Sequence, residues 1–256
     1  MYNDLFSIGP ISIHSYGVLT GLALLAAIIL ASGRAKKRGM NDDICYGILF
    51  VGVIFGYLCS KTTYILVEWD SFIENPQMFL STSGFVVMGG LIGGIIAAGI
   101  YCKLKKVNFL DYLDLCAPSI AIAQGIGRIG CFMAGCCYGK ETDSFIGIAF
   151  KNSDYAPNGV KLIPTQLISS LGNFINMAIL LILAKKTKKK GAIIGAYITI
   201  YSIGRFLIEF LRADDRGNVG ILSTSQMLSL VTVLVGIAFL CWAFLRKEDK
   251  NEEIQA

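Results

Sequence analysis

Long apolar runs, separated by short polar stretches, occupy most of the chain. Seven of them reach or approach the roughly 20 residues that an α-helix needs to cross the hydrocarbon layer of a membrane. The expected spans are residues 16–33, 44–66, 85–102, 111–133, 164–184, 191–211 and 224–245. The pattern therefore predicts an all-α, polytopic membrane protein with seven transmembrane helices and no separate soluble domain.

The basic residues predict how these helices are oriented. Clusters of Lys and Arg follow the first, third, fifth and seventh runs, at residues 34–38, 103–106, 185–190 and 246–250. Because short basic loops stay in the cytoplasm, we expect the N-terminus outside and the C-terminus inside. Residues 1–246 would then form one membrane domain, with 134–163 as an extracytoplasmic loop or lid and 247–256 as a cytoplasmic tail.

The composition agrees with a membrane protein. Hydrophobic residues make up 54% of the chain and charged residues only 16%, which is unlike an ordinary soluble domain. The net charge of +5 lies in the short clusters rather than along one soluble face, so we expect no nucleic-acid partner. The first apolar run reaches full spanning length, so we expect no cleavable signal peptide.

One arginine stands near the end of the fourth apolar run. Arg128 is surrounded by Gly125, Gly127 and Gly130. Placing an arginine near the middle of a spanning helix costs about 3 kcal/mol on insertion scales. We therefore expect Arg128 to face the protein interior and to hold an anionic group.

The sixth run carries a second group of charges. Arg205, Glu209 and Arg212 are four and three residues apart, so they share one helix face. Together with Arg128 they set three guanidinium groups against one carboxylate. Arginine binds phosphate through paired hydrogen bonds, so a phospholipid headgroup site is favoured over a purely structural ion-pair cluster.

Three further patterns admit more than one interpretation. The glycines of residues 89–94 allow either close helix packing or the approach of a lipid headgroup. His14 and Tyr16 begin the first run, as interfacial anchors or as functional groups. Cys131, Cys136 and Cys137, three of eight cysteines, lack a standard zinc spacing. We expect no metal or cofactor there, and packing residues rather than a reactive thiol pair.

Several segments together resemble the prolipoprotein diacylglyceryl transferase family. They are residues 6–17, 85–94, 125–139, 163–167, 204–215 and 224–229, which match in order along nearly the whole chain. The resemblance implies a seven-helix enzyme of the bacterial cytoplasmic membrane. It implies transfer of a diacylglyceryl group from phosphatidylglycerol to the lipobox cysteine thiol of a preprolipoprotein, on the outer side of the membrane.

The resemblance also implies roles for individual residues. Arg128 matches the family's signature arginine, which binds phosphatidylglycerol. Arg205, Glu209 and Arg212 match the charged face of the family's sixth helix, and Tyr16 matches a tyrosine of the first. These five are the expected catalytic residues, with Glu209 orienting one of its neighbouring arginines. The expected substrate-binding residues are Arg128, Gly89, Gly90, Gly130 and Gln166.

The chain departs from the family at several positions. Met88 stands where the family usually has a histidine, which is often proposed to handle the thiol proton. Cys131, Ala134 and Cys136 replace three polar residues of the signature. The group that accepts the proton therefore stays open among Glu209, Tyr16, His14 and the arginines, which could lower the thiol pKa without a base.

These departures keep other functions in view. The chain could transfer a lipid fragment to a different acceptor, or bind phospholipid without catalysis. A channel or transporter is disfavoured because we expect only the fourth and sixth runs to carry internal charge and find no repeat symmetry. A retinal protein is disfavoured because the seventh run has no lysine.

Overall fold

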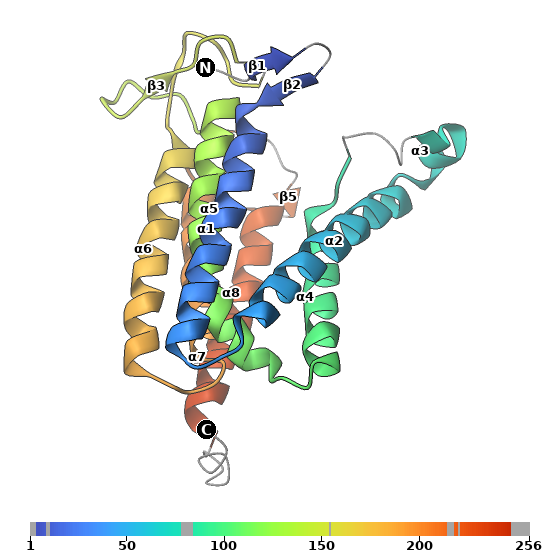
Figure 1. Ribbon diagram of the computed structural model, residues 1–256. Coiled ribbons are helices and arrows are strands. Elements are labelled where there is room, and N and C mark those ends of the chain that lie inside the picture. Colours follow the sequence, from blue (N-terminus) through green and yellow to red (C-terminus); the bar gives the residue numbers. More distant parts are fainter. Residues whose placement is uncertain are drawn as a thin grey trace. The chain divides into compact units, whose positions relative to one another are not determined.

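The computed structural model describes residues 4–8, 11–77, 84–153, 155–213, 218–219 and 221–246. Seven of its described helices are long and apolar enough to span a membrane. They are α1 (Ser15–Lys37), α2 (Asp42–Val67), α4 (Val87–Leu104), α5 (Phe109–Ala134), α6 (Thr165–Lys186), α7 (Ala192–Glu209) and α8 (Thr224–Leu245) (Figure 1). The seven predicted spans are thus confirmed, with ends that differ by a few residues.

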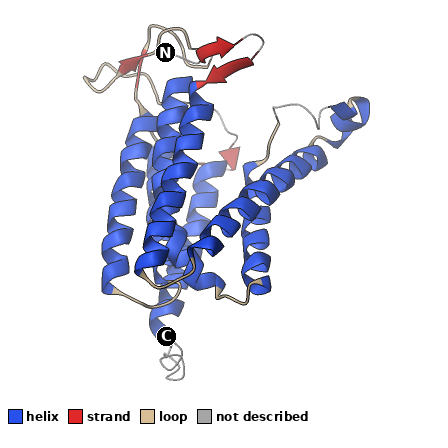
Figure 2. Ribbon diagram, viewed as in Figure 1, coloured by secondary structure: helices blue, strands red, loops and turns tan. Residues whose placement is uncertain are grey.

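Short elements join these helices. Helix α3 (Trp69–Glu74) follows α2. Three antiparallel strand pairs complete the described structure (Figure 2). They are β1 (Asp4–Ile8) with β2 (Ile11–His14), β3 (Ile148–Ala149) with β4 (Lys161–Leu162), and β5 (Asn218–Val219) with β6 (Leu222–Ser223).

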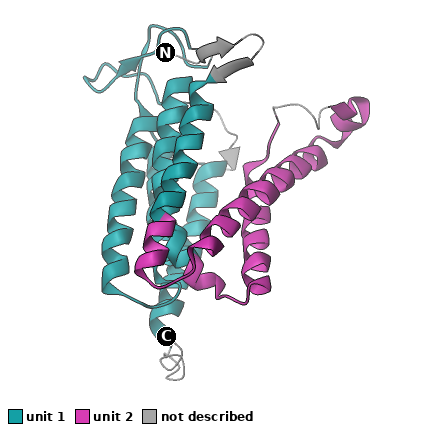
Figure 3. Cartoon of the chain, viewed as in Figure 1, with its two compact units in different colours: residues 1–30, 113–256 teal, residues 31–112 magenta. Residues whose placement is uncertain are grey.

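The chain divides into two compact units (Figure 3). Unit 1 comprises residues 1–30 and 113–256, and unit 2 comprises residues 31–112. The single membrane domain expected over residues 1–246 stays a prediction. The expected tail, 247–256, lies outside the described residues.

In unit 1, helices α5, α6 and α7 enclose a shared apolar core. It contains Ala117 and Ala121 of α5, Leu180 of α6, and Ile193 and Tyr197 of α7, all buried. The alanines let the α5 backbone come close to its neighbours, because they project only a methyl group. Helix α7 also packs along α8.

A buried carboxylate ties α5 to the beginning of α7. Asp114 of α5 accepts hydrogen bonds from the backbone N–H groups of Gly191, at 2.6 Å, and Ile194, at 2.8 Å. The first N–H groups of a helix have no partner within the helix, and a negative charge there is favoured by the helix dipole. Asp114 thus fixes the beginning of α7 against α5.

In unit 2, small residues bring α4 against α2. A Cβ atom on Gly90 would lie 2.9 Å from the carbonyl oxygen of Gly56, and one on Gly89 would lie 3.0 Å from that of Cys59. Lys61 of α2 is fully buried, with its ammonium 4.6 Å from the centre of the Phe85 ring. The expectation that only the fourth and sixth spans carry internal charge is therefore wrong, because α2 carries Lys61.

The described residues of the predicted loop 134–163 contain a small buried cluster. Phe150, Ala156 and Leu162 are buried together. Backbone hydrogen bonds join the N–H of Gly139 to the carbonyl of Ile163 and the N–H of Lys140 to that of Leu211. The beginning of the loop is therefore held beside the end of α7.

Candidate functional site

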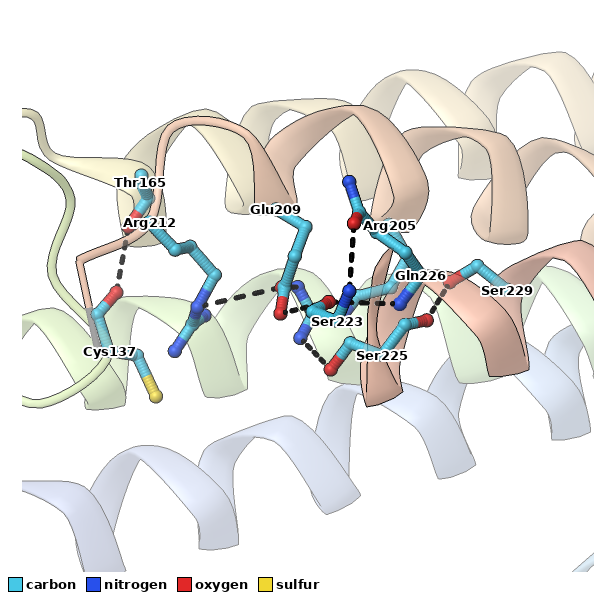
Figure 4. A network of polar contacts seen from close by, with 9 residues as sticks. All are labelled: Cys137, Thr165, Arg205, Glu209, Arg212, Ser223, Ser225, Gln226 and Ser229. Carbon is cyan, nitrogen blue, oxygen red and sulfur yellow. Dashed lines mark hydrogen bonds and ion pairs between the residues drawn. The ribbon is translucent and has the colours of Figure 1, made fainter. Parts of the chain in front are cut away.

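Arg205 and Glu209 share a face of α7 as predicted, but the helix ends at Glu209, so Arg212 reaches the same carboxylate from the segment that follows the helix. Glu209 Oε2 lies 2.7 Å from Nη1 of Arg205 and 3.9 Å from Nε of Arg212 (Figure 4). All three side chains are largely buried, with 14%, 7% and 4% of the surface of Arg205, Glu209 and Arg212 exposed. One carboxylate therefore serves two guanidinium groups in a water-poor environment.

Helix α8 supports this pair from the other side. Ser223 donates a hydrogen bond to Glu209 Oε1 at 3.0 Å, and Arg205 donates one to the Ser225 hydroxyl at 2.9 Å. Ser223 is also the N-cap of α8 and forms a capping box with Gln226, which satisfies free N–H groups at the helix end. The beginning of α8 thereby holds Glu209 and Arg205 in position.

A cavity of about 430 Å³ opens beside this network, lined by residues of α5, α6 and α7. Arg128 and Arg205 both line it, together with Asn173, Asn176 and Tyr201. Within the described part of the chain, no carboxylate pairs with Arg128. The two arginines therefore face one space that has room for an anionic group.

The Asp114 contact explains why Arg128 and Arg205 lie at the same level along α5 and α7. Arg128 lies as far beyond Asp114 along α5 as Arg205 lies beyond Gly191 along α7. At 1.5 Å per residue, each helix rises about 21 Å from the shared hydrogen bond to its arginine. Two helices that start level and rise equally bring their arginines to the same level.

Asn176 of α6 gives the cavity a second polar feature. Its side chain is buried, and neither its amide nitrogen nor its amide oxygen has a hydrogen-bond partner among the described residues. Buried polar groups are nearly always hydrogen-bonded. An unpartnered amide in a cavity wall is thus suited to bind a polar group of a ligand.

Glycine at position 130 brings α1 close to α5, just beyond Arg128. A Cβ atom there would lie 3.2 Å from the Cδ2 atom of Tyr16. The phenol of Tyr16 is close enough to Arg128 and Cys131 to interact with them electrostatically. The predicted residues Tyr16, Arg128 and Gly130 thus come together in unit 1.

The end of α5 and the following loop gather three thiols. The Sγ atoms of Cys131, Cys136 and Cys137 all lie within 4.8 Å of one another. The loop turns back on the helix, because the Cys136 N–H donates to the Cys131 carbonyl at 3.2 Å and Cys137 takes a left-handed φ of 63°. Residues separated in sequence by a spacing untypical of metal sites are therefore adjacent in space.

Side chains from α6 fix this loop. Gln166 donates to the Cys136 carbonyl and Thr165 to the Cys137 carbonyl, both at 2.7 Å. Gln166, which we expected to bind substrate, is almost fully buried and contacts the loop. In this structure its amide nitrogen positions the thiol cluster.

The thiols of Cys136 and Cys137 differ in the direction of their pKa shifts. Contacts with the Cys131 and Cys136 side chains, and a smaller one with the Arg212 guanidinium, lower the pKa of Cys137. The same contacts with Cys131 and Cys137 raise the pKa of Cys136. Arg212 is thus one of the groups that lower the pKa of Cys137.

The remaining predicted residues lie elsewhere. Gly89, Gly90 and Met88 belong to unit 2, where the two glycines pack α4 on α2. His14 ends β2 and is exposed. Their expected roles in substrate binding or proton transfer stay predictions.

Two polar cavity residues inside one apolar helix were not predicted from the sequence. Asn173 and Asn176 lie in α6, which hydropathy describes as an ordinary span, yet both line the cavity. A signal was present, because two amides three residues apart share a helix face. Polar side chains inside a membrane usually face a cavity or the protein interior.

Comparison with known proteins gives consistent results. Residues 3–242 match the family described as prolipoprotein diacylglyceryl transferase. The chain is 47% identical, over 91% of its length and 94% of the relative's, to the phosphatidylglycerol–prolipoprotein diacylglyceryl transferase of Clostridium tetani. It is 45% identical to the second such protein of Clostridium perfringens, over 89% and 90% of the two chains, and 35% identical to that of Clostridioides difficile, over 96% of each.

Proposed function

Because the chain belongs to the prolipoprotein diacylglyceryl transferase family, we propose that it transfers a diacylglyceryl group from phosphatidylglycerol to the lipobox cysteine thiol of a preprolipoprotein. Glycerol phosphate is the leaving group. The observation that carries this proposal is the cavity into which Arg128 and Arg205 both face. It offers positive charge to a headgroup within a protein built from seven membrane-spanning helices.

The arginines act on the phosphate. The acceptor sulfur attacks the glyceryl carbon, the carbon–oxygen bond breaks, and the phosphate oxygen takes the bonding electrons. The phosphate thereby gains one negative charge as it departs. Guanidinium groups held in a water-poor cavity stabilise such developing charge more than water does, and Arg128 and Arg205 are placed to do so.

Glu209 and its neighbours position these groups. Glu209 holds Arg205 and Arg212 through one carboxylate, and α8 fixes Glu209 through Ser223. Tyr16 lies beside Arg128 and the thiols, at the level where the acceptor would meet the lipid. Gly130 and Gln166 serve by permitting the approach of Tyr16 and by holding the loop.

The proposed location is the bacterial cytoplasmic membrane, with the N-terminus and the loop 134–163 outside. Basic loops on the opposite side support this orientation. The acceptor would then reach the site from the outer surface, where a secreted preprolipoprotein first exposes its lipobox. No further cofactor is part of this proposal.

A reconstituted assay tests the proposal. Full-length protein in liposomes that contain phosphatidylglycerol receives a synthetic lipobox peptide, and mass spectrometry measures the thioether-linked product. We expect product from the wild type and a loss of about 100-fold or more with Arg128→Ala, the cost typical of removing one charge-stabilising donor. Arg128→Lys should also fall well below the wild type, because lysine cannot form the paired hydrogen bonds.

Lys188→Ala is the matched control, since it removes a positive charge from a loop away from the cavity. It should retain wild-type activity. Absence of thioether product from folded wild-type protein would refute the proposal. Label from the lipid in a molecule other than the peptide would instead favour a different acceptor, an alternative motivated by Cys131, Ala134 and Cys136 at positions where the family is usually polar.

A further inference from the structure

The three thiols have the arrangement of ligands around a small ion. Cys131 comes from the last turn of α5, and Cys136 and Cys137 come from the loop that folds back on it. Their Sγ atoms lie within 4.8 Å of one another. Bonds of about 2.3 Å to a tetrahedral zinc ion place sulfur atoms about 3.8 Å apart. A closing movement of up to about 1 Å would bring all three sulfurs to the spacing of zinc ligands.

The number of ligands indicates the kind of site. Among the described residues the cluster offers three ligand atoms, all sulfur. Structural zinc sites are closed by four protein ligands, whereas catalytic sites have three and leave the fourth position for water or substrate. Three thiolates are also soft ligands, which suit zinc better than magnesium or calcium. The cluster thus matches an open zinc site.

The surrounding charges favour thiolate ligands. Two guanidinium groups lie close enough to interact with these thiols: Arg212 interacts with Cys137, and Arg128, which precedes Cys131 on α5, interacts with Cys131 and Cys137. Three thiolates and one Zn²⁺ carry a net charge of −1, which these guanidiniums offset. Groups that contact the ligands in this way tune both the affinity and the reactivity of a metal site.

We propose that Cys131, Cys136 and Cys137 bind a zinc ion whose fourth position takes the acceptor cysteine. This inference rests on the proposed function and supplies the activation of its nucleophile. A thiol bound to zinc loses its proton to water, because the ion stabilises the thiolate. No histidine or carboxylate base is then needed, which fits a chain with methionine at position 88.

The chemical step balances without any other reactant. The zinc-bound thiolate forms the carbon–sulfur bond with the glyceryl carbon, and the carbon–oxygen bond electrons pass to the phosphate near Arg128. The thioether product is neutral and is a weaker ligand than a thiolate, so it leaves the ion. The zinc ion is unchanged, and the next acceptor thiol replaces the product.

Metal binding is tested first, independently of turnover. Full-length protein purified in detergent is analysed for zinc by mass spectrometry, and Co²⁺ is then added to metal-stripped protein. We expect about one zinc per chain, together with the charge-transfer absorption of cobalt bound by thiolates. Cys131→Ser, Cys136→Ser and Cys137→Ser should each weaken or abolish both signals.

Cys241→Ser is the matched control, because Cys241 is an exposed cysteine of α8 outside the cluster. It should bind metal as the wild type does. Size-exclusion elution in detergent confirms that each serine variant is folded. Zinc content or cobalt absorption that persists in all three cluster variants would overturn the proposal, and so would a wild type that binds neither metal.

The activity assay separates this proposal from the proposed function. Removal of zinc with a chelator should abolish thioether formation, and added Zn²⁺ should restore it. Full activity of metal-free protein would overturn the zinc proposal and leave the transferase proposal intact. If zinc binds at the three cysteines but no thioether product forms, the transferase proposal is refuted and only the metal site remains.

Discussion

At the scale of single residues, the site has more guanidinium groups than carboxylates to pair with them. Glu209 is shared by Arg205 and Arg212, while Arg128 faces the cavity with no carboxylate partner in the described chain. Breaking one side of a buried ion pair typically costs about 3–5 kcal/mol, because the other charge stays buried. The roles of these residues can therefore be separated by substitution.

Glu209→Gln should lower kcat more than it changes KM for phosphatidylglycerol. The amide keeps the shape of the carboxylate but not its charge, so Arg205 and Arg212 lose their common anchor while Arg128 stays available to the lipid. We expect a fall of about 10-fold or more in kcat, of the order of one charged hydrogen bond. Steady-state kinetics in mixed micelles measure both constants.

Ser223→Ala is the control for that substitution, because it removes one hydrogen bond from a neutral donor to Glu209 and leaves the carboxylate in place. Its effect should be clearly smaller. Equal effects of the two substitutions would contradict an electrostatic role for Glu209.

Asn176→Leu should raise KM for phosphatidylglycerol without destabilising the protein. The buried amide has no partner among the described residues, so an apolar side chain of similar size removes an unsatisfied group. Thermal unfolding in detergent should occur at the same or a higher temperature than in the wild type, whereas lipid saturation should require more lipid. An unchanged KM would argue against contact between Asn176 and the lipid.

At the scale of helices, Asp114 determines how α5 and α7 align. Its carboxylate contacts Gly191, and the stretch of α5 from Asp114 to Arg128 is as long in sequence as the stretch from Gly191 to Arg205. Residues far from the cavity thereby control the distance between the two arginines. The same alignment buries the apolar core that α5 and α7 share.

Asp114→Ala should therefore affect stability and activity together. It leaves the N–H groups of Gly191 and Ile194 buried without their acceptor, at a cost of about 1–3 kcal/mol for each unsatisfied group. We expect a lower unfolding temperature in detergent and reduced transfer activity. Asp114→Asn, which keeps one acceptor oxygen, should be intermediate; a variant with normal unfolding and normal activity would contradict the alignment.

Hydropathy was sufficient to predict the seven spans, because each must satisfy its backbone internally and cover roughly the same thickness. Helical spacing was sufficient to predict that Arg205 and Glu209 meet, since both lie on one helix. It could not predict the gathering of Cys131 with Cys136 and Cys137, which depends on a loop held by Gln166 from another helix. Nor could it predict the contact of Asp114 with α7, which joins residues 77 positions apart.

At the scale of the whole molecule, the expected orientation makes a prediction about accessibility. A single cysteine introduced at Lys140 should react with a membrane-impermeant thiol reagent in intact cells, because the loop 134–163 is expected outside. One introduced at Lys188 should react only after the cells are broken. Both variants are made in a chain in which all eight native cysteines are replaced by serine. The reverse labelling pattern would show that the orientation is opposite to the expected one.

The lack of a carboxylate partner for Arg128 among the described residues also bears on the order in which the two substrates arrive. A buried guanidinium that no carboxylate neutralises is costly in a medium of low dielectric constant. We therefore expect another anionic lipid from the surrounding bilayer to replace the product as soon as it leaves. The resting enzyme would then be one that already carries its donor. Each secreted acceptor would meet an enzyme that already has lipid bound. The rate of lipoprotein maturation would then depend on the supply of preprolipoprotein and not on the binding of lipid.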